Sequence, residues 1–217
     1  MGFLRNLFRT TPIPTTDGAF SPSPLAIKLG TSTTTDYDGG AYAKPYVGPK
    51  NRVLMICTEE RNMTMANGKK FSTGNHPVEM GLPMLHLMNA GFEIDIVTPT
   101  GAPVAIEEWA MPADDADVKG LYRDHADAFA NPGSLGDFVA HKMNDEAPYA
   151  AVYIPGGHGA MLGLPDNEDV GKVLHWAHEQ DLFTLALCHG PAALLAANTE
   201  TGFLYDGYKM TVFPDSV

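Results

Sequence analysis

The stretch Leu182-Phe183-Thr184-Leu185-Ala186-Leu187-Cys188-His189-Gly190-Pro191-Ala192-Ala193-Leu194-Leu195 decides the fold. Residues 182–187 are an apolar run of strand length, and the alanine- and leucine-rich residues after Pro191 have a helical pattern. Between them a sharp turn is predicted, because glycine tolerates unusual backbone angles and proline suits the first turn of a helix. We therefore predict a strand–turn–helix unit with the Cys188 side chain at the bend.

Cys188 is either a nucleophile or a packing residue. A turn of this kind pushes the side chain out of the sheet, and the free N–H groups at the start of the next helix would point at the sulfur. That arrangement favours the thiolate and is expected to lower the pKa of the cysteine. The alternative is that Cys188 is a small buried hydrophobic residue, as free cysteines usually are. The motif favours the catalytic interpretation.

Composition restricts the class of protein. The 217 residues, 44% of them hydrophobic and 18% charged, are typical of a soluble globular protein with one sizeable core. A formal net charge of -12 argues against a general nucleic-acid surface or an anionic-membrane surface. Two cysteines make no disulfide framework, which favours a cytoplasmic location. No apolar run approaches the roughly 20 residues that span a bilayer, and we expect no signal peptide.

Strands and helices are predicted to alternate after a polar start. Residues 1–50 are expected to form an N-terminal arm, of which residues 10–50 either wrap the core or are partly disordered, and residues 51–217 form the core domain. Strands are predicted at 52–57, 92–98, 149–154, 182–187 and 208–213, and helices at 75–91, 118–129, 135–143 and 169–180. Residues 58–74 are predicted to form a polar loop.

This alternation predicts an α/β fold of the flavodoxin-like type, a three-layer sandwich with a mostly parallel sheet between helices. The segment at about 101–148 lies between two strands and is predicted to be a small inserted subdomain or lid.

A glycine-rich turn is expected beside Cys188. Gly156, Gly157 and His158 follow the strand at 149–154, where open α/β sheets bind ligands. Such a turn can direct backbone N–H groups at an oxyanion, or it can be a plain loop; next to a nucleophile the oxyanion interpretation is favoured.

Three further residues could assist a nucleophile. His189 adjoins the cysteine and is a candidate base. Asp215 is a candidate carboxylate partner, although the residues alone favour a polar residue in a terminal turn. Glu79 is either an acid at the site or a carboxylate favoured by the dipole of its helix.

A metal site is not indicated by spacing. His86, Glu93 and His125 are irregularly spaced, and neither Cys-x-x-Cys nor His-Glu-x-x-His occurs. Structural histidines are therefore the favoured interpretation.

Five motifs, taken in order, resemble the glyoxalase III and heat-shock-protein-31 chaperone family. This family lies within the PfpI-type, class I glutamine-amidotransferase-like superfamily. The motifs are Lys69–Glu79, Glu108–Pro112, Ile154–Ala160, Leu187–Ala193 and Phe213–Asp215. The resemblance runs from about Tyr42 to the end of the sequence.

The resemblance implies a cofactor-independent glyoxalase that converts methylglyoxal to lactate without glutathione. Cys188 would be the nucleophile, His189 and Asp215 its triad partners, and Glu79 the acid beside the sulfur. This family is also associated with stress, with holding of unfolded client proteins and with a protein deglycase activity, and its members are typically homodimers. The enzyme would thus be a lyase (a D-lactate dehydratase) or a deglycase hydrolase. A holding chaperone with little catalysis and a cysteine peptidase of the same superfamily are the alternatives.

The sequence departs from the family pattern in two places. The family's metal site is His, Glu and His, and the matching positions here are Met88, Glu93 and His125. A thioether is a soft ligand, poorly matched to a hard carboxylate, so we predict no required cofactor, with zinc at Glu93 and His125 as the alternative. Family members also continue beyond the Phe-Pro-Asp motif. The sequence is therefore either a piece of a longer protein or a form with a shortened sheet.

Overall fold

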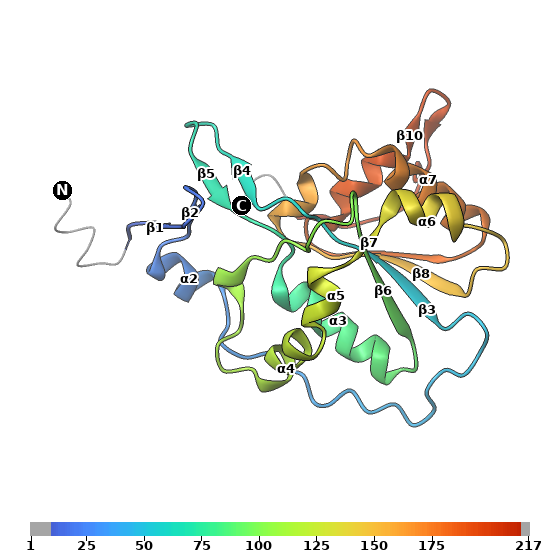
Figure 1. Cartoon of the computed structure of the whole chain (residues 1–217), viewed down its shortest axis with the longest axis horizontal. Helices are drawn as coiled ribbons and strands as arrows, with labels where there is room; N and C mark the ends of the chain where they lie inside the picture. Colours follow the sequence, from blue (N-terminus) through green and yellow to red (C-terminus); the bar gives the residue numbers. More distant parts are fainter. Residues whose placement is uncertain (1–9, 214–217) are drawn as a thin grey trace.

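A five-stranded parallel sheet forms the centre of the computed structural model, which describes residues 10–213 (Figure 1). Every neighbouring pair in this sheet runs parallel. In spatial order the strands are β7 (Gly133–Ser134), β6 (Glu93–Thr98), β3 (Arg52–Ile56), β8 (Tyr149–Ile154) and β9 (Phe183–Ala186). The predicted parallel sheet is confirmed.

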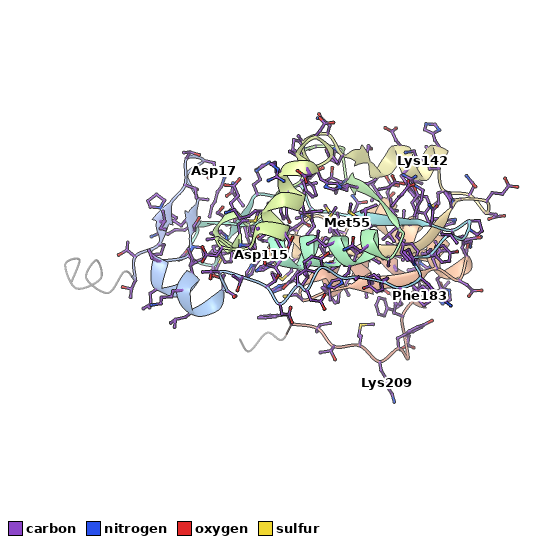
Figure 2. The ribbon with its side chains drawn as sticks, turned by 90° about the horizontal axis from the view of Figure 1, so that it is seen from below. Asp17, Met55, Asp115, Lys142, Phe183 and Lys209 are labelled. Carbon is purple, nitrogen blue, oxygen red and sulfur yellow. The ribbon has the colours of Figure 1, made fainter. Side chains whose placement is uncertain are left out.

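Alternate residues of the central strands enter two different cores, because successive side chains of a strand point to opposite faces. Leu54 and Ile56 pack with α6 (Leu135–His141) and α7 (Glu168–Glu179). Val53 and Met55 pack on the other face with α3 (Pro77–Asn89), α4 (Ala116–Asp124) and α5 (Ala126–Ala130). Met55 accordingly lies inside the molecule, between the layers (Figure 2). The predicted three-layer α/β sandwich is confirmed.

The segment 101–148 contributes to both layers of helices. Its helices α4 and α5 cover one face of the sheet, and β7 and α6 extend the sheet and cover the other (Figure 1). The single helix predicted at 118–129 is wrong: α4 and α5 meet at His125, whose backbone is not helical. The short helix η1 (Glu108–Ala110) carries Trp109, whose ring centre lies 6.3 Å from that of His158. The division into an arm, a core and an insert stays a prediction.

The N-terminal arm lies along the core and pairs with one of its hairpins. It contains β1 (Ile13–Pro14), β2 (Phe20–Ser21) and α2 (Pro24–Gly30). Strand β2 pairs with β5 (Lys70–Ser72), which forms a hairpin with β4 (Asn62–Thr64). The sequence predicted a polar loop over 58–74; that prediction is wrong, because the arm supplies a partner strand that stabilises the hairpin.

The last part of the described chain differs most from expectation. After η3 (Gly190–Ala197), strands β10 (Asn198–Thr199) and β11 (Gly202–Phe203) form a projecting hairpin (Figure 1). Residues 208–213, predicted to be a strand, are irregular. All of their side chains are exposed. Neither face of a strand at 208–213 would therefore be buried, and nothing would fix its register.

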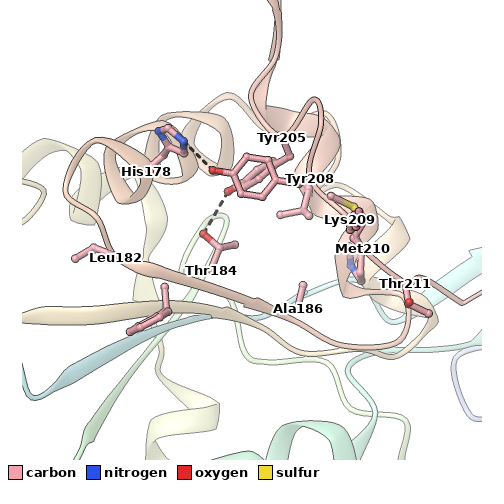
Figure 3. Close-up of a pocket in the computed structure, with 12 residues that line it drawn as sticks. His178, Leu182, Thr184, Ala186, Tyr205, Tyr208, Lys209, Met210 and Thr211 are labelled. Atoms are coloured by element: carbon pink, nitrogen blue, oxygen red, sulfur yellow. Dashed lines mark hydrogen bonds between the residues drawn. The ribbon is translucent and has the colours of Figure 1, made fainter.

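An open groove of about 440 Å³ lies beside β9, the edge strand of the sheet. Phe183 in β9 is 73% exposed. Figure 3 shows the groove, in which the Tyr208 hydroxyl lies 3.2 Å from His178 Nε2 and the Tyr205 hydroxyl lies 3.3 Å from the Thr184 hydroxyl. In the part of the chain that the structure describes, every helix is too short or too polar to cross a membrane.

Candidate active site around Cys188

Cys188 occupies a strained turn at the carboxyl end of β9. The preceding N–H, of Leu187, still bonds to the Ile154 carbonyl of β8 at 3.3 Å. Cys188 itself has a φ of 51°, in the left-handed region that non-glycine residues rarely adopt. Gly190 closes the turn by donating its N–H to the Leu187 carbonyl at 2.6 Å. A strained residue at this position is typical of a nucleophile turn.

The helix predicted after the turn is present and is a 3₁₀ helix. It begins at Gly190, and Pro191 stands in its first turn as expected. A Cβ on Gly190 would lie 2.6 Å from the Ile154 carbonyl oxygen, so only glycine lets the turn approach β8 this closely. The tight packing holds Cys188 beside the end of β8.

Glu79 converges with Cys188 on Gly156. A Cβ added to Gly156 would overlap Glu79 Oε2 and lie 2.7 Å from Cys188 Cβ. Glu79 Oε2 is buried and has no hydrogen-bond partner among residues 10–213. A buried carboxylate oxygen beside a sulfur, with no other polar partner described, is available to exchange a proton.

The break in the hydrogen bonding of α3 helps to position Glu79. Pro83 lies inside the helix and has no N–H to donate to the Glu79 carbonyl one turn earlier. The Tyr153 hydroxyl of β8 donates to that carbonyl instead. The helix turn that carries Glu79 is therefore tied to the strand that leads into the glycine turn.

Burial and, after it, the neighbouring Glu79 carboxylate raise the pKa of the Cys188 thiol to about 11. This corrects the expectation of a lowered pKa. The backbone N–H groups of His189 and Gly157 act in the opposite direction, but they are outweighed. At neutral pH these effects favour the thiol form of Cys188 over the thiolate. Cys188 is partly exposed, whereas Cys57 is fully buried.

The two N–H groups that face the sulfur are the candidate oxyanion donors. Gly157 has a φ of 103°, and a Cβ there would overlap the backbone of Gly74 and His76. The His76 N–H donates to the Gly156 carbonyl at 2.9 Å, which fixes the turn against the start of α3. The structure thus brings Gly156, Gly157 and Cys188 together. The N–H of His158, the third residue predicted for the oxyanion turn, instead donates to Glu107 Oε1 at 3.1 Å.

His189 lies against the sulfur and between two rings. Its Nδ1 is 3.2 Å from Cys188 Sγ. The His189 ring stacks on Phe213 at 4.5 Å and lies 4.7 Å from the His158 ring. Burial lowers the pKa of His189, which favours the neutral base. Asp215, the predicted carboxylate partner, lies outside the described residues, and its role stays a prediction.

Glu107 is a site residue that the sequence pattern does not single out. Its side chain is fully buried, and Oε1 accepts hydrogen bonds from His158 Nδ1 at 2.7 Å and from the Thr73 hydroxyl at 3.1 Å. This carboxylate raises the pKa of His158. In the sequence, the only indication of a role for Glu107 is that it directly precedes the motif Glu108–Pro112. The sequence does not show which of these two adjacent glutamates is buried.

The residues suggested for zinc do not fit a metal site. Glu93 forms a surface ion pair with Arg52 at 2.5 Å, and His125 Nδ1 lies 3.1 Å from the Leu121 carbonyl oxygen. Across residues 10–213 no three His, Cys, Asp or Glu side chains are grouped to hold a metal ion. We derive no step through zinc, and the absence of a required cofactor stays a prediction.

A cavity of about 430 Å³ opens onto Glu79 and His76. Its opposite wall comes from the N-terminal arm and is rich in hydroxyl groups, supplied by Thr31, Ser32, Thr34 and Thr35. The arm therefore forms part of an approach to Glu79.

Residues 72–215, which include Glu79, Glu107, the glycine turn after β8 and Cys188, match the model of the DJ-1/PfpI family. The chain belongs to the DJ-1/PfpI family. The protein/nucleic acid deglycase HchA of Pseudomonas aeruginosa is 46% identical over 217 residues, which cover 98% of this chain and 74% of that relative. The HchA deglycase of Staphylococcus aureus is 46% identical over 209 residues, or 95% of this chain and 71% of the relative.

Solved structures agree with this membership of the DJ-1/PfpI family. Glyoxalase III from Candida albicans superposes with a TM-score of 0.62 and 25% identity, over 77% of this chain and 70% of that one. The resemblance stated from the five motifs and the predicted fold class are both confirmed.

Proposed function

We propose that this DJ-1/PfpI-family protein is an enzyme of small 2-oxoaldehydes that converts methylglyoxal to lactate without glutathione. One observation carries the proposal: the partly exposed Cys188 thiol lies between the Glu79 carboxylate, the His189 ring and two backbone N–H groups. The names of the relatives, deglycase and glyoxalase III, support carbonyl chemistry at such a site.

The first step is addition of the sulfur to the aldehyde. His189 Nδ1, 3.2 Å from the sulfur, accepts the thiol proton as the S–C bond forms. The aldehyde oxygen takes up the electron pair and is held by the N–H groups of Gly157 and His189. Protonation of that oxygen gives a hemithioacetal.

The second step moves a proton between adjacent carbons. Glu79 removes the proton from the former aldehyde carbon, which gives an enediol, and returns a proton to the neighbouring carbon. The product is a thioester of lactate on Cys188. Water then cleaves the S–C bond, releasing lactate and the thiol, so that methylglyoxal and one water account for all atoms of the product.

The same nucleophile suits a deglycase reaction, in which the carbonyl adduct of an amine replaces the free aldehyde. Whether the enzyme works as a lyase or as a hydrolase is decided by which substrate gives the higher kcat/KM. Location in the cytoplasm, a role in stress and a homodimeric state remain part of the proposal.

A holding chaperone is the second candidate. Apolar side chains are exposed along the open edge of the sheet, including Phe183 at 73% and Leu185 at 39%. Such surface can bind unfolded clients. Suppression of aggregation of a heated client at equimolar dose, retained in Cys188→Ala, would support it; failure to suppress aggregation would exclude it.

The test of the enzyme is lactate formation from methylglyoxal without added glutathione. We expect Cys188→Ala to lose at least about 10³-fold in kcat, because the covalent route is closed. Cys57→Ala is the matched control and should retain activity, provided that its thermal unfolding shows a folded protein. Undiminished activity in Cys188→Ala would refute the proposal.

A further inference from the structure

The buried carboxylate of Glu107 needs a cation, and the structure offers His158. Glu107 Oε1 accepts hydrogen bonds from both the Nδ1 and the backbone N–H of His158, at 2.7 and 3.1 Å. Its Oε2 is buried and has no partner within residues 10–213. An unpaired buried carboxylate is costly, so the positive charge of an imidazolium at His158 offsets a charge that would otherwise be unfavourable.

His158 in turn lies against the catalytic histidine. The centres of the His158 and His189 rings are 4.7 Å apart, and the ring planes differ by 33°. Two imidazoles at this separation repel one another strongly when both are protonated. A charge held on His158 therefore opposes a charge on His189, whose Nδ1 lies 3.2 Å from the Cys188 sulfur.

We propose that Glu107 and His158 are positioning residues for the reaction at Cys188, with Glu107 holding the positive charge on His158 so that His189 stays neutral. A neutral His189 can accept the thiol proton; a protonated one cannot. Neither Glu107 nor His158 needs to contact the substrate. This inference rests on the proposed function and assigns a role to a residue pair outside the Cys188, His189 and Glu79 set.

The other groups around His189 do not replace this effect. Within the described residues, burial, His158 and His76 lower the pKa of His189, and Glu107 raises it. Phe213 covers the second face of the ring and has no charge. Glu79 faces Cys188 and raises the pKa of His158 together with Glu107. Among the charged groups near His189, the positive charge of His158 thus opposes protonation of His189 most strongly, and its removal makes His189 easier to protonate.

The test compares the pH dependence of kcat/KM in the wild type, Glu107→Gln and His158→Phe. His158→Phe should move the acid limb of the profile to higher pH by about half a unit to one unit, because His189 becomes easier to protonate. Glu107→Gln should move the limb in the same direction but by less, because it also removes a carboxylate that raises the pKa of His189. Activity should recover at higher pH. Glu108→Gln is the matched control, since it removes the same charge from the next, exposed residue and should leave the profile unchanged. The proposal is overturned if the acid limb of the two variants stays at the wild-type position or moves to lower pH.

A second measurement does not depend on turnover or on the stability of the variants. Histidine side-chain NMR of the wild type should show His158 remaining protonated to a higher pH than His189, and the reverse order overturns the inference. In folded Glu107→Gln the titration of His189 should move to higher pH. If the wild type forms no lactate, the proposed function fails, whereas this titration still decides the role of the pair.

Discussion

At the scale of residues, the chemistry of the site depends on the transfer of the Cys188 thiol proton to a neighbouring base. The Cys188 sulfur carries a raised pKa because it is buried and because Glu79 lies beside it. A helix start and two N–H groups are expected to favour the thiolate, but here burial and a second anion outweigh them. The nucleophile is thus released only when a base accepts its proton, which explains why His189 lies against the sulfur.

Glu79→Gln should raise the rate of Cys188 alkylation and lower the rate of lactate formation. Loss of the carboxylate lowers the pKa of the thiol, so alkylation by iodoacetamide at pH 8 should become about three- to tenfold faster. Lactate formation should fall by about 10²-fold or more, because the proton can no longer be moved between carbons. Both rates are measured on one preparation, with Glu60→Gln, an exposed carboxylate, as the control. If the two rates fell together, Glu79 would have only a structural role.

At the scale of elements, the site lies where glycine residues allow the ends of β8 and β9 and the start of α3 to pack closely. The apolar runs of β3, β6, β8 and β9 and the pattern of α3 and α7 could be predicted, because each has a strong period and clear ends. Gly156, Gly157 and Gly190 sit where a Cβ would collide with neighbouring atoms. Glycine-rich turns after strands could likewise be recognised from sequence.

Other elements were not predictable because they depend on distant partners. Residues 208–213 alternate like a strand, yet in the described chain they have no face to bury. The β4–β5 hairpin looked like a polar loop because its stabilising neighbour, β2, lies some 50 residues earlier in the chain. Glu107 is indistinguishable from Glu108 in sequence, and only tertiary packing buries one and exposes the other.

Gly156→Ala tests whether this close approach positions the site. The added Cβ would overlap Glu79 Oε2 and crowd Cys188 Cβ, so we expect a loss of about 10²-fold in kcat/KM. Gly120→Ala in α4 is the control, because the nearest atom to its Cβ is Arg123 Nη2 at 3.6 Å. Steady-state lactate formation and thermal unfolding are measured for both. Full activity in Gly156→Ala would show that the contact between Glu79 and Cys188 is not required.

At the scale of the whole molecule, the arm is tied to the core through α4. Asp115 caps that helix by accepting the Val118 N–H at 2.9 Å, and it also accepts the N–H and the hydroxyl of Thr35 in the arm. Figure 2 shows Asp115 beside α4. One carboxylate therefore links the start of a helix to the segment that lines the cavity at Glu79.

Asp115→Ala should lower the free energy of unfolding by about 1–2 kcal/mol at pH 7, as the loss of a helix cap does. Although burial opposes ionisation, hydrogen bonds from Thr35 and Val118 hold the pKa of Asp115 below its usual value. A lowered pKa contributes stability that is present at neutral pH and lost as pH falls below about 4. The difference from the wild type in urea unfolding should therefore shrink in acid.

The exposed neighbour Asp114 supplies the control for this prediction, since Asp114→Ala should leave stability within about 0.5 kcal/mol of the wild type. Limited proteolysis should cleave the arm faster in Asp115→Ala only. Equal stability and equal cleavage of the two variants would mean that the tie is unimportant.

The central claim is that the Cys188 sulfur is the nucleophile, and progressive alkylation tests it most directly. The protein is treated with limiting iodoacetamide at pH 8, and peptide mass spectrometry gives the labelled fraction of each cysteine beside the remaining rate of lactate formation. We predict that activity falls in direct proportion to the labelled fraction of Cys188, that methylglyoxal protects it, and that buried Cys57 stays unlabelled. Full activity in protein whose Cys188 is completely alkylated would contradict the account.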